Sequence, residues 1–131
     1  MDVLYKTVVR TNDAAVSTRH LLWTEGATAG STALASATAV AIGTIDNIES
    51  DTGIAQNVLV LGKGPMKKVV ASEAISIGDR VYQAASGKVA KSGTILIGIA
   101  DTAAGADGDV IRIRDHAPII IDAEIVTVIR R

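Results

Sequence analysis

The stretch Val69–Arg114, VVASEAISIGDRVYQAASGKVAKSGTILIGIADTAAGADGDVIRIR, decides the fold of this chain. It alternates short apolar runs with breaks centred on glycine, a pattern typical of tight antiparallel strands rather than helices. Two Gly-Asp steps, Gly78-Asp79 and Gly108-Asp109, each precede such an apolar run. Glycine supplies the positive φ that a turn needs, and aspartate can cap the turn through the backbone. We therefore predict that both steps start strands.

The composition favours a β-protein with an aliphatic core. Hydrophobic residues make up 48% of the 131 residues and aromatic residues only 2%, so Ile, Val, Leu and Ala must fill the interior. These aliphatic side chains suit closely packed, pleated strands. A chain of this length can bury a core as a single domain. The absence of cysteine excludes disulfide and thiol chemistry and fits assembly in a reducing cytoplasm.

The charge balance gives no sign of a nucleic-acid or membrane partner. Thirteen basic and 14 acidic residues give a net charge of −1, so no global field attracts nucleic acid or an anionic membrane. Residues 1–10 lack the apolar block of a secretory signal. The longest weakly polar run, residues 32–45, is shorter than the ~20 apolar residues that cross a bilayer. We expect a soluble intracellular protein.

Further strands are predicted on both sides of the central stretch. Thr32–Ile45 is the ambiguous segment, because its alanines favour helix whereas Ser, Thr, Val, Ile and Gly43 weaken that preference, and we favour strand. Residues 25–31 are small and have little to pack, so we expect a surface loop or an arm there. The other predicted strands are Tyr5–Arg10, His20–Thr24, Val58–Leu61 and Ile119–Ile129.

The faces of two central strands can be predicted from alternation. In Asp109–Arg114 the isoleucines face one way and the arginines the other, which is typical of a half-buried strand. In Thr94–Ala100 the residues Ile95, Ile97 and Ile99 oppose Leu96, Gly98 and Ala100, so both faces look covered. This indicates a central strand in which Gly98 lets another backbone come close.

About eight to ten short strands at hairpin spacing predict an all-β protein, a small antiparallel β-barrel or sandwich. We expect a single domain, with residues 1–31 as an N-terminal arm and first strands and residues 32–131 as the body. The C-terminal strand, if it lies at an edge, can dock on another subunit through its unpaired backbone.

No pattern of catalytic, cofactor-binding or metal-ligating residues is found. His20 and His116 lack a second histidine at ligand spacing, and the aspartates between 101 and 115 do not match a calcium loop. The glycines around Lys63 lack the order of a phosphate-binding loop, and no Ser, His and acid can be linked into a triad. We therefore expect no enzyme, no cofactor and no metal.

One basic cluster, Lys63, Lys67 and Lys68, leaves two interpretations open. It is either a solvated hairpin face or a contact with an acidic protein surface. The surrounding hairpin, Gly64-Pro65-Met66-Lys67-Lys68, also faintly resembles the Met-Lys-Met hairpin of biotin carriers. A biotinyl or lipoyl-like carrier domain is thus an alternative, although Pro65 and Lys68 depart from that pattern. A ligand-binding barrel is disfavoured by the scarcity of aromatic residues.

Val69–Arg114 resembles the phage capsid decoration proteins, also called head-stabilising or capsid cement proteins. The resemblance lies in the order of VVASEAISIGDRVY, ASGKV, IGIA and AAGADGDVIRIR, and covers about a third of the chain. The alanine-rich segment before Asp46 and the tail after Asp115 do not follow the family pattern. The resemblance implies a virion protein, assembled in the host cytoplasm, on the outer face of an icosahedral head. It also implies a protein, often a homotrimer, that bridges copies of the major capsid protein against the pressure of packaged DNA.

For such a role we expect contacts with neighbouring copies or with the capsid. The arm (residues 1–31) or the tail (residues 119–131) would reach a neighbouring chain by strand addition. The residues predicted to make these contacts are Tyr5, Val9, Trp23, Lys67, Lys68, Ile119, Ile121 and Ile125.

Overall fold

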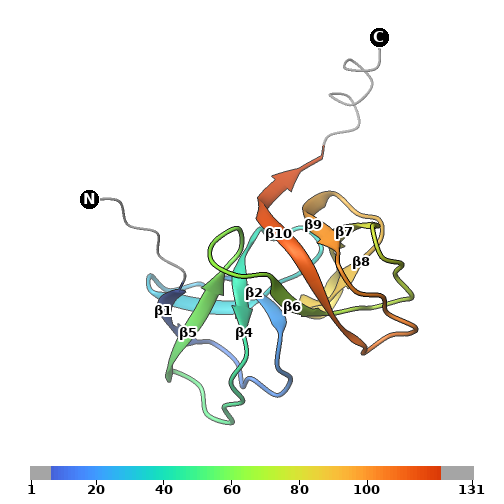
Figure 1. Ribbon diagram of the computed structural model, residues 1–131. Helices are drawn as coiled ribbons and strands as arrows, with labels where there is room; N and C mark the ends of the chain where they lie inside the picture. The colour runs from blue at the N-terminus through green and yellow to red at the C-terminus, as the bar shows by residue number, and fades with distance from the viewer. Residues whose placement is uncertain (1–6, 122–131) are drawn as a thin grey trace.

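A computed structural model describes residues 7–121 and shows an all-β protein, which confirms the predicted fold class (Figure 1). Within these residues, ten strands form two five-stranded sheets, and the chain passes from one to the other between β5 and β6. No helix of this part of the chain is long and apolar enough to cross a membrane. The strands are β1 (Thr7–Asn12), β2 (Leu21–Glu25), β3 (Ser31–Leu34), β4 (Ala41–Ile45), β5 (Ala55–Val60), β6 (Lys67–Val70), β7 (Arg80–Gln83), β8 (Val89–Ala90), β9 (Ile95–Ala100) and β10 (Val110–Ile120).

The first sheet is a closed barrel of order β1-β3-β2-β4-β5, in which β1 pairs parallel with β3 and antiparallel with β5. β1 runs two residues past the predicted end of this strand at Arg10, through Asn12. The buried side chain of Asn12 donates to Asp51 O at 2.7 Å and accepts from Ile54 N at 2.8 Å, so it anchors the loop before β5. The predicted boundary after residue 31 falls inside β3, so residues 7–31 belong to the barrel.

Strand is confirmed for Thr32–Ile45, which contributes most of β3 and all of β4. The loop between them, residues 35–40, is held by Gln83 from the other sheet. Its Nε2 donates to Ser36 O at 2.9 Å and Ala39 O at 2.8 Å, and its Oε1 accepts from Ala41 N at 2.9 Å. One buried amide therefore fixes a loop of the first barrel to β7.

The second sheet has the order β6-β10-β9-β7-β8, and both Gly-Asp steps start strands in it as predicted. Gly78 and Gly108 have φ values of 89° and 95°, which only glycine adopts without strain. The aspartate that follows Gly108 accepts hydrogen bonds from Gly105 N and Ala106 N, which closes the turn. The sheet curls until Ala71, after β6, bridges β8 in parallel.

The predicted faces hold for β10 and partly for β9. Ile111 and Ile113 are buried and the intervening arginines are exposed. β9 lies between β10 and β7, and a Cβ added to Gly98 would lie 2.5 Å from Arg114 O, which confirms the close approach. The face predicted for Ile99 is wrong, because β7 and β9 shift register between Val81 and Tyr82. This bulge turns Ile99 outwards, at 37% exposure, and buries Ala100.

The two sheets share one aliphatic core. The larger cluster joins Leu22, Ala35, Ala41 and Leu61 of the first barrel to buried residues of the second sheet. A smaller cluster around Trp23 fills the interior of the first barrel. Because the main core crosses the junction between the sheets, burial couples them into one unit.

Candidate functional site

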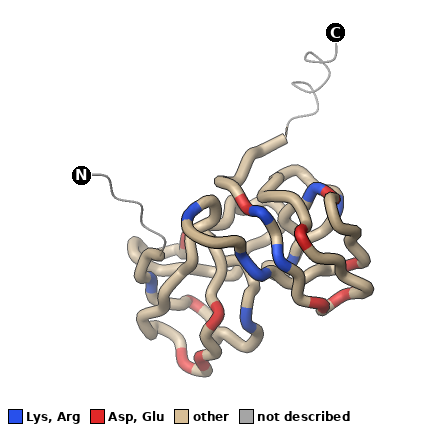
Figure 2. The backbone as a smooth tube through the Cα atoms, in the orientation of Figure 1, with Lys and Arg blue, Asp and Glu red and all other residues tan. Residues whose placement is uncertain are grey.

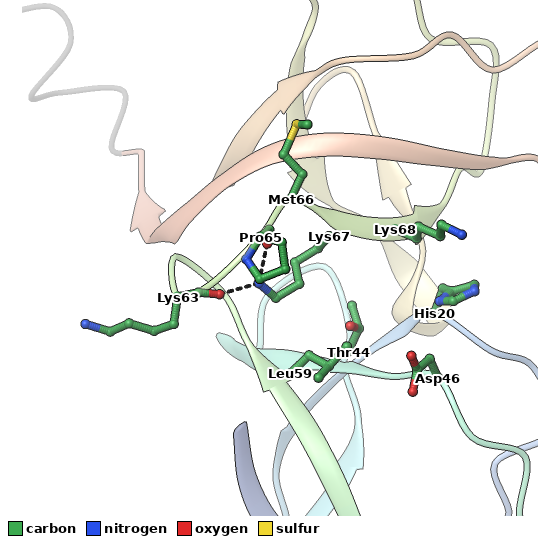
Figure 3. A pocket seen from close by; sticks show the side chains of 9 residues that line it. All are labelled: His20, Thr44, Asp46, Leu59, Lys63, Pro65, Met66, Lys67 and Lys68. Atoms are coloured by element: carbon green, nitrogen blue, oxygen red, sulfur yellow. Dashed lines mark hydrogen bonds between the residues drawn. The ribbon is translucent and has the colours of Figure 1, made fainter. Parts of the chain in front are cut away.

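A cleft lies where the two sheets meet, and it contains the basic cluster predicted from the sequence (Figure 3). His20, Thr44, Asp46 and Leu59 line it from the first barrel. The β5–β6 loop and β6 supply the opposite wall, which is formed by Lys63, Pro65, Met66, Lys67 and Lys68.

Lys67 is buried at the base of this cleft, with 4% of its surface exposed. Its Nζ donates to the carbonyl oxygens of Lys63 and Pro65, and it lies 3.5 Å from Asp115 Oδ2. The same carboxylate accepts a hydrogen bond from Gly62 N. Removing one partner of a buried charge pair leaves an uncompensated charge, so Lys67 and Asp115 hold the loop 62–66 against β10.

The three lysines do not form one basic patch. Figure 3 shows the side chains of Lys63 and Lys68 extending in opposite directions from the cleft, with Lys67 between them. Successive residues of a strand point to opposite faces, which separates Lys67 from Lys68. In the register of β6 and β10, Lys68 lies directly opposite Arg112. Contact with an acidic protein surface stays a prediction for the exposed Lys68.

His20 lies at the edge of the same cleft with a left-handed backbone, φ 70°. Burial lowers its pKa below the ordinary 6.5, Lys68 and Arg19 lower the pKa further, and Asp46 opposes them. The imidazole is therefore neutral at pH 7. Among residues 7–121 no three His, Asp or Glu side chains gather as a metal site would require.

Four of the predicted contact residues lie at the surface. Val9 is 65% exposed on β1, and Ile119 is 49% exposed near the end of β10. Lys68 is exposed on β6, and Ile121, directly after β10, is partly exposed. Val9 lies on the first sheet, whereas Lys68, Ile119 and Ile121 lie on or directly after strands of the second sheet, so the four do not make up one site.

Two other predicted contact residues are interior. Trp23 is 1% exposed in the core of the first barrel, and Lys67 is used within the β5–β6 loop. Their side chains serve the protein itself, against the expectation that they contact a partner. The burial of Lys67 also speaks against the carrier alternative, because a modified lysine must stand free at its hairpin tip. Tyr5 and Ile125 lie outside the described residues.

The aspartates between 101 and 115 each have a structural use. Asp101 binds Arg112, Asp107 binds Lys88, and Asp115 binds the loop at residue 62. Asp109 closes the turn before β10. The four carboxylates therefore make separate contacts within the described residues.

β10 extends beyond the strand beside it. Its last pair with β6 joins Ile113 to Lys67, and the rest of the strand pairs only with β9 among residues 7–121. A register shift between Asp115 and Ile119 bends this end, and its final pairs bring Ile119 to Leu96 and Ile120 to Ile95. One edge of the end of β10 is therefore left without a strand partner in the described chain.

A comparison with protein families matches residues 23–115 to the model of a phage cement protein. This range runs from β2 into β10 and contains the whole stretch on which the sequence resemblance rests. A search of curated proteins finds no match to the chain. Since the family match covers more than half of the chain, this protein belongs to the phage cement protein family, and its role is that of a structural, capsid-stabilising protein of the virion.

Proposed function

We propose that this protein binds the outer surface of an icosahedral phage head and stabilises contacts between neighbouring major capsid protein subunits. In this role it resists the outward pressure of packaged DNA. The family match over residues 23–115 carries the proposal. The shared core of the two sheets supports it, because a cement protein needs a body that does not deform under load.

The strand edges fit a protein that binds a shell without aggregating. The first barrel is closed, and the second sheet curls until Ala71 bridges β8. Exposed strand edges are a common route to aggregation, and closure removes them. The end of β10 keeps one edge without a strand partner among the described residues, so it is the place where we expect a partner strand to add.

We further propose that the protein acts as a homotrimer. A specific interface buries ~1,600 Å² in total, and several modest contacts of one oligomer gain affinity through avidity. The arm (residues 1–31) or the tail (residues 119–131) would reach a neighbouring copy or the capsid. Near the two ends of the described residues, Val9 and Ile119 are exposed and Ile121 is partly exposed. This function needs no catalysis, cofactor, nucleic acid or membrane.

The decisive experiment mixes the purified protein with empty expanded and unexpanded heads of the phage that encodes it. We expect co-sedimentation with expanded heads alone, and a higher temperature of head disruption. Equal binding to both forms, or binding to neither, would contradict the proposal.

A chain that ends at residue 121 tests the tail in the same assay. We expect lower oligomer mass in sedimentation velocity and weaker head binding than for the full chain. If both stay unchanged, residues 122–131 make neither the oligomer contact nor the head contact.

A further inference from the structure

The outer face of the second sheet carries a basic surface with an apolar centre. We call this the arginine face and define it by Lys68, Arg80, Ile99, Arg112 and Arg114, all exposed. Its register follows from the strand pairs: Ile99 on β9 lies between Arg114 on β10 and Arg80 on β7. Lys68 on β6 lies opposite Arg112 on β10.

The side chains of this face come close together because the sheet spaces them. Neighbouring strands are about 4.8 Å apart, so the two arginines that flank Ile99 start about 10 Å from one another across the sheet. Arg112 and Arg114 are two residues apart on one strand and therefore share the face. Figure 2 shows basic residues of β6 and β10 side by side.

Most of the positive charge on this face has no partner within the described chain. Arg112 binds Asp101, with its Nη2 at 2.9 Å from Oδ2. Lys68, Arg80 and Arg114 make no ion pair with any residue from 7 to 121. Like charges directly opposite on neighbouring strands are destabilising, as for the pair of Lys68 and Arg112. The face therefore concentrates cations in a chain whose net charge is −1.

Exposed apolar side chains lie at the centre of the cations and beside them. Ile99 is 37% exposed at their centre, and Ile119, paired with Leu96, is 49% exposed on the same sheet. The nearby Tyr82 is partly covered, because the backbone at Gly93 lies against it. Proteins that bind single-stranded nucleic acid usually stack its bases on exposed aromatic rings. Among the described residues, this face has no exposed aromatic ring, so it does not suit a nucleic-acid partner.

We propose that the arginine face binds an acidic protein segment in which carboxylates flank an apolar side chain. The apolar side chain packs on Ile99, and the carboxylates pair with Arg80 and Arg114, whose guanidinium groups suit bidentate contacts. This inference rests on the proposed function in one respect, since it assigns the segment to the capsid partner. It locates the basic contact on the outer face of β6, β7, β9 and β10, which shares Lys68 with the lining of the cleft.

The head-binding test uses the double variant Arg80→Glu/Arg114→Glu. The matched control is Arg19→Glu/Lys91→Glu, which makes the same change in net charge at two exposed residues that belong neither to the face nor to the lining of the cleft. We expect the affinity for expanded heads to fall about tenfold or more for the face variant. The control should stay within about twofold of the unmodified protein, and thermal unfolding verifies that both variants are folded. Unchanged binding of the face variant overturns the arginine face but leaves the proposed function intact.

A second measurement tests the face without heads, so it remains decisive if the unmodified protein fails to bind them. The ¹⁵N-labelled full chain is titrated with a Glu-Leu-Glu peptide, a Lys-Leu-Lys peptide and a single-stranded oligonucleotide. We expect the acidic peptide alone to shift amide signals around Ile99, and to lose this effect in the face variant. No shift, or stronger binding of the oligonucleotide at the same residues, refutes the proposal.

Discussion

Replacing Gln83 with alanine tests whether one side chain joins the two sheets. Gln83 is 1% exposed, and it makes three hydrogen bonds of 2.8–2.9 Å to Ser36 O, Ala39 O and Ala41 N. Each bond contributes about 1 kcal/mol net, and buried groups left without a partner cost more. We therefore expect Gln83→Ala to lower the free energy of unfolding by about 3 kcal/mol.

Gln56 provides a control with the same side chain and similar burial. It is 3% exposed, its Oε1 accepts one bond of 3.3 Å from Asn47, and its Nε2 has no partner among residues 7–121. Both alanine variants lose the same side-chain volume, so the difference between them isolates the hydrogen bonds. We expect Gln56→Ala to cost about 1 kcal/mol from lost bonding, which is about 2 kcal/mol less than Gln83→Ala.

Urea unfolding followed by circular dichroism measures both free energies by linear extrapolation. Hydrogen exchange gives a second readout, because release of the loop 35–40 should accelerate exchange at Ala41 N. Equal losses of stability for the two variants, within about 0.5 kcal/mol, would refute the idea that Gln83 couples the sheets.

Two further predictions concern backbone approach and pH. Gly98→Ala places a Cβ 2.5 Å from Arg114 O and should lower the free energy of unfolding by about 2 kcal/mol or more. Gly105→Ala is the control, because the nearest atom to its Cβ lies at 3.4 Å, and it should change stability far less. Thermal unfolding compares the two variants, and equal effects would contradict the packing argument. His20 has a lowered pKa in the folded state, so the unfolded chain binds a proton more readily and stability falls as pH drops below about 6.5. His20→Asn, which tolerates the positive φ, should remove this part of the acid sensitivity in urea unfolding at pH 7.5 and 5.5, and an unchanged loss on acidification would show that other groups cause it.

Local chemistry in the sequence was enough to locate many of the strands. Gly78 and Gly108 fix their turns through their own φ, and the alternation after Gly108 gives the buried face of β10 without reference to any other strand. These features depend on a few consecutive residues. The family resemblance rests on the same pieces, which is why the sequence also indicated the correct family.

The errors come from features that depend on distant residues. The exposure of Ile99 follows from a register shift against β7, which the sequence of β9 does not contain. Trp23 is predicted to contact a partner, but closure of β1 on β5 places it inside a barrel. The separation of Lys67 from Lys68 could have been predicted, because adjacent strand residues face opposite ways. The strands that follow the two Gly-Asp steps carry exposed arginines, Arg80 in β7 and Arg112 and Arg114 in β10, and these residues indicate the arginine face from the sequence.

The connection between the two sheets has a mechanical consequence. The described chain begins in the first barrel at residue 7 and ends beyond the second sheet at residue 121 (Figure 1). Tension applied between these two ends must pass through the junction, where Gln83 holds the loop 35–40, Gly87 N donates to Ala35 O, and Asp115 accepts from Gly62 N. If its two ends were attached to different subunits, this protein would transmit strain from one to the other, and the junction would set the force at which that link gives way.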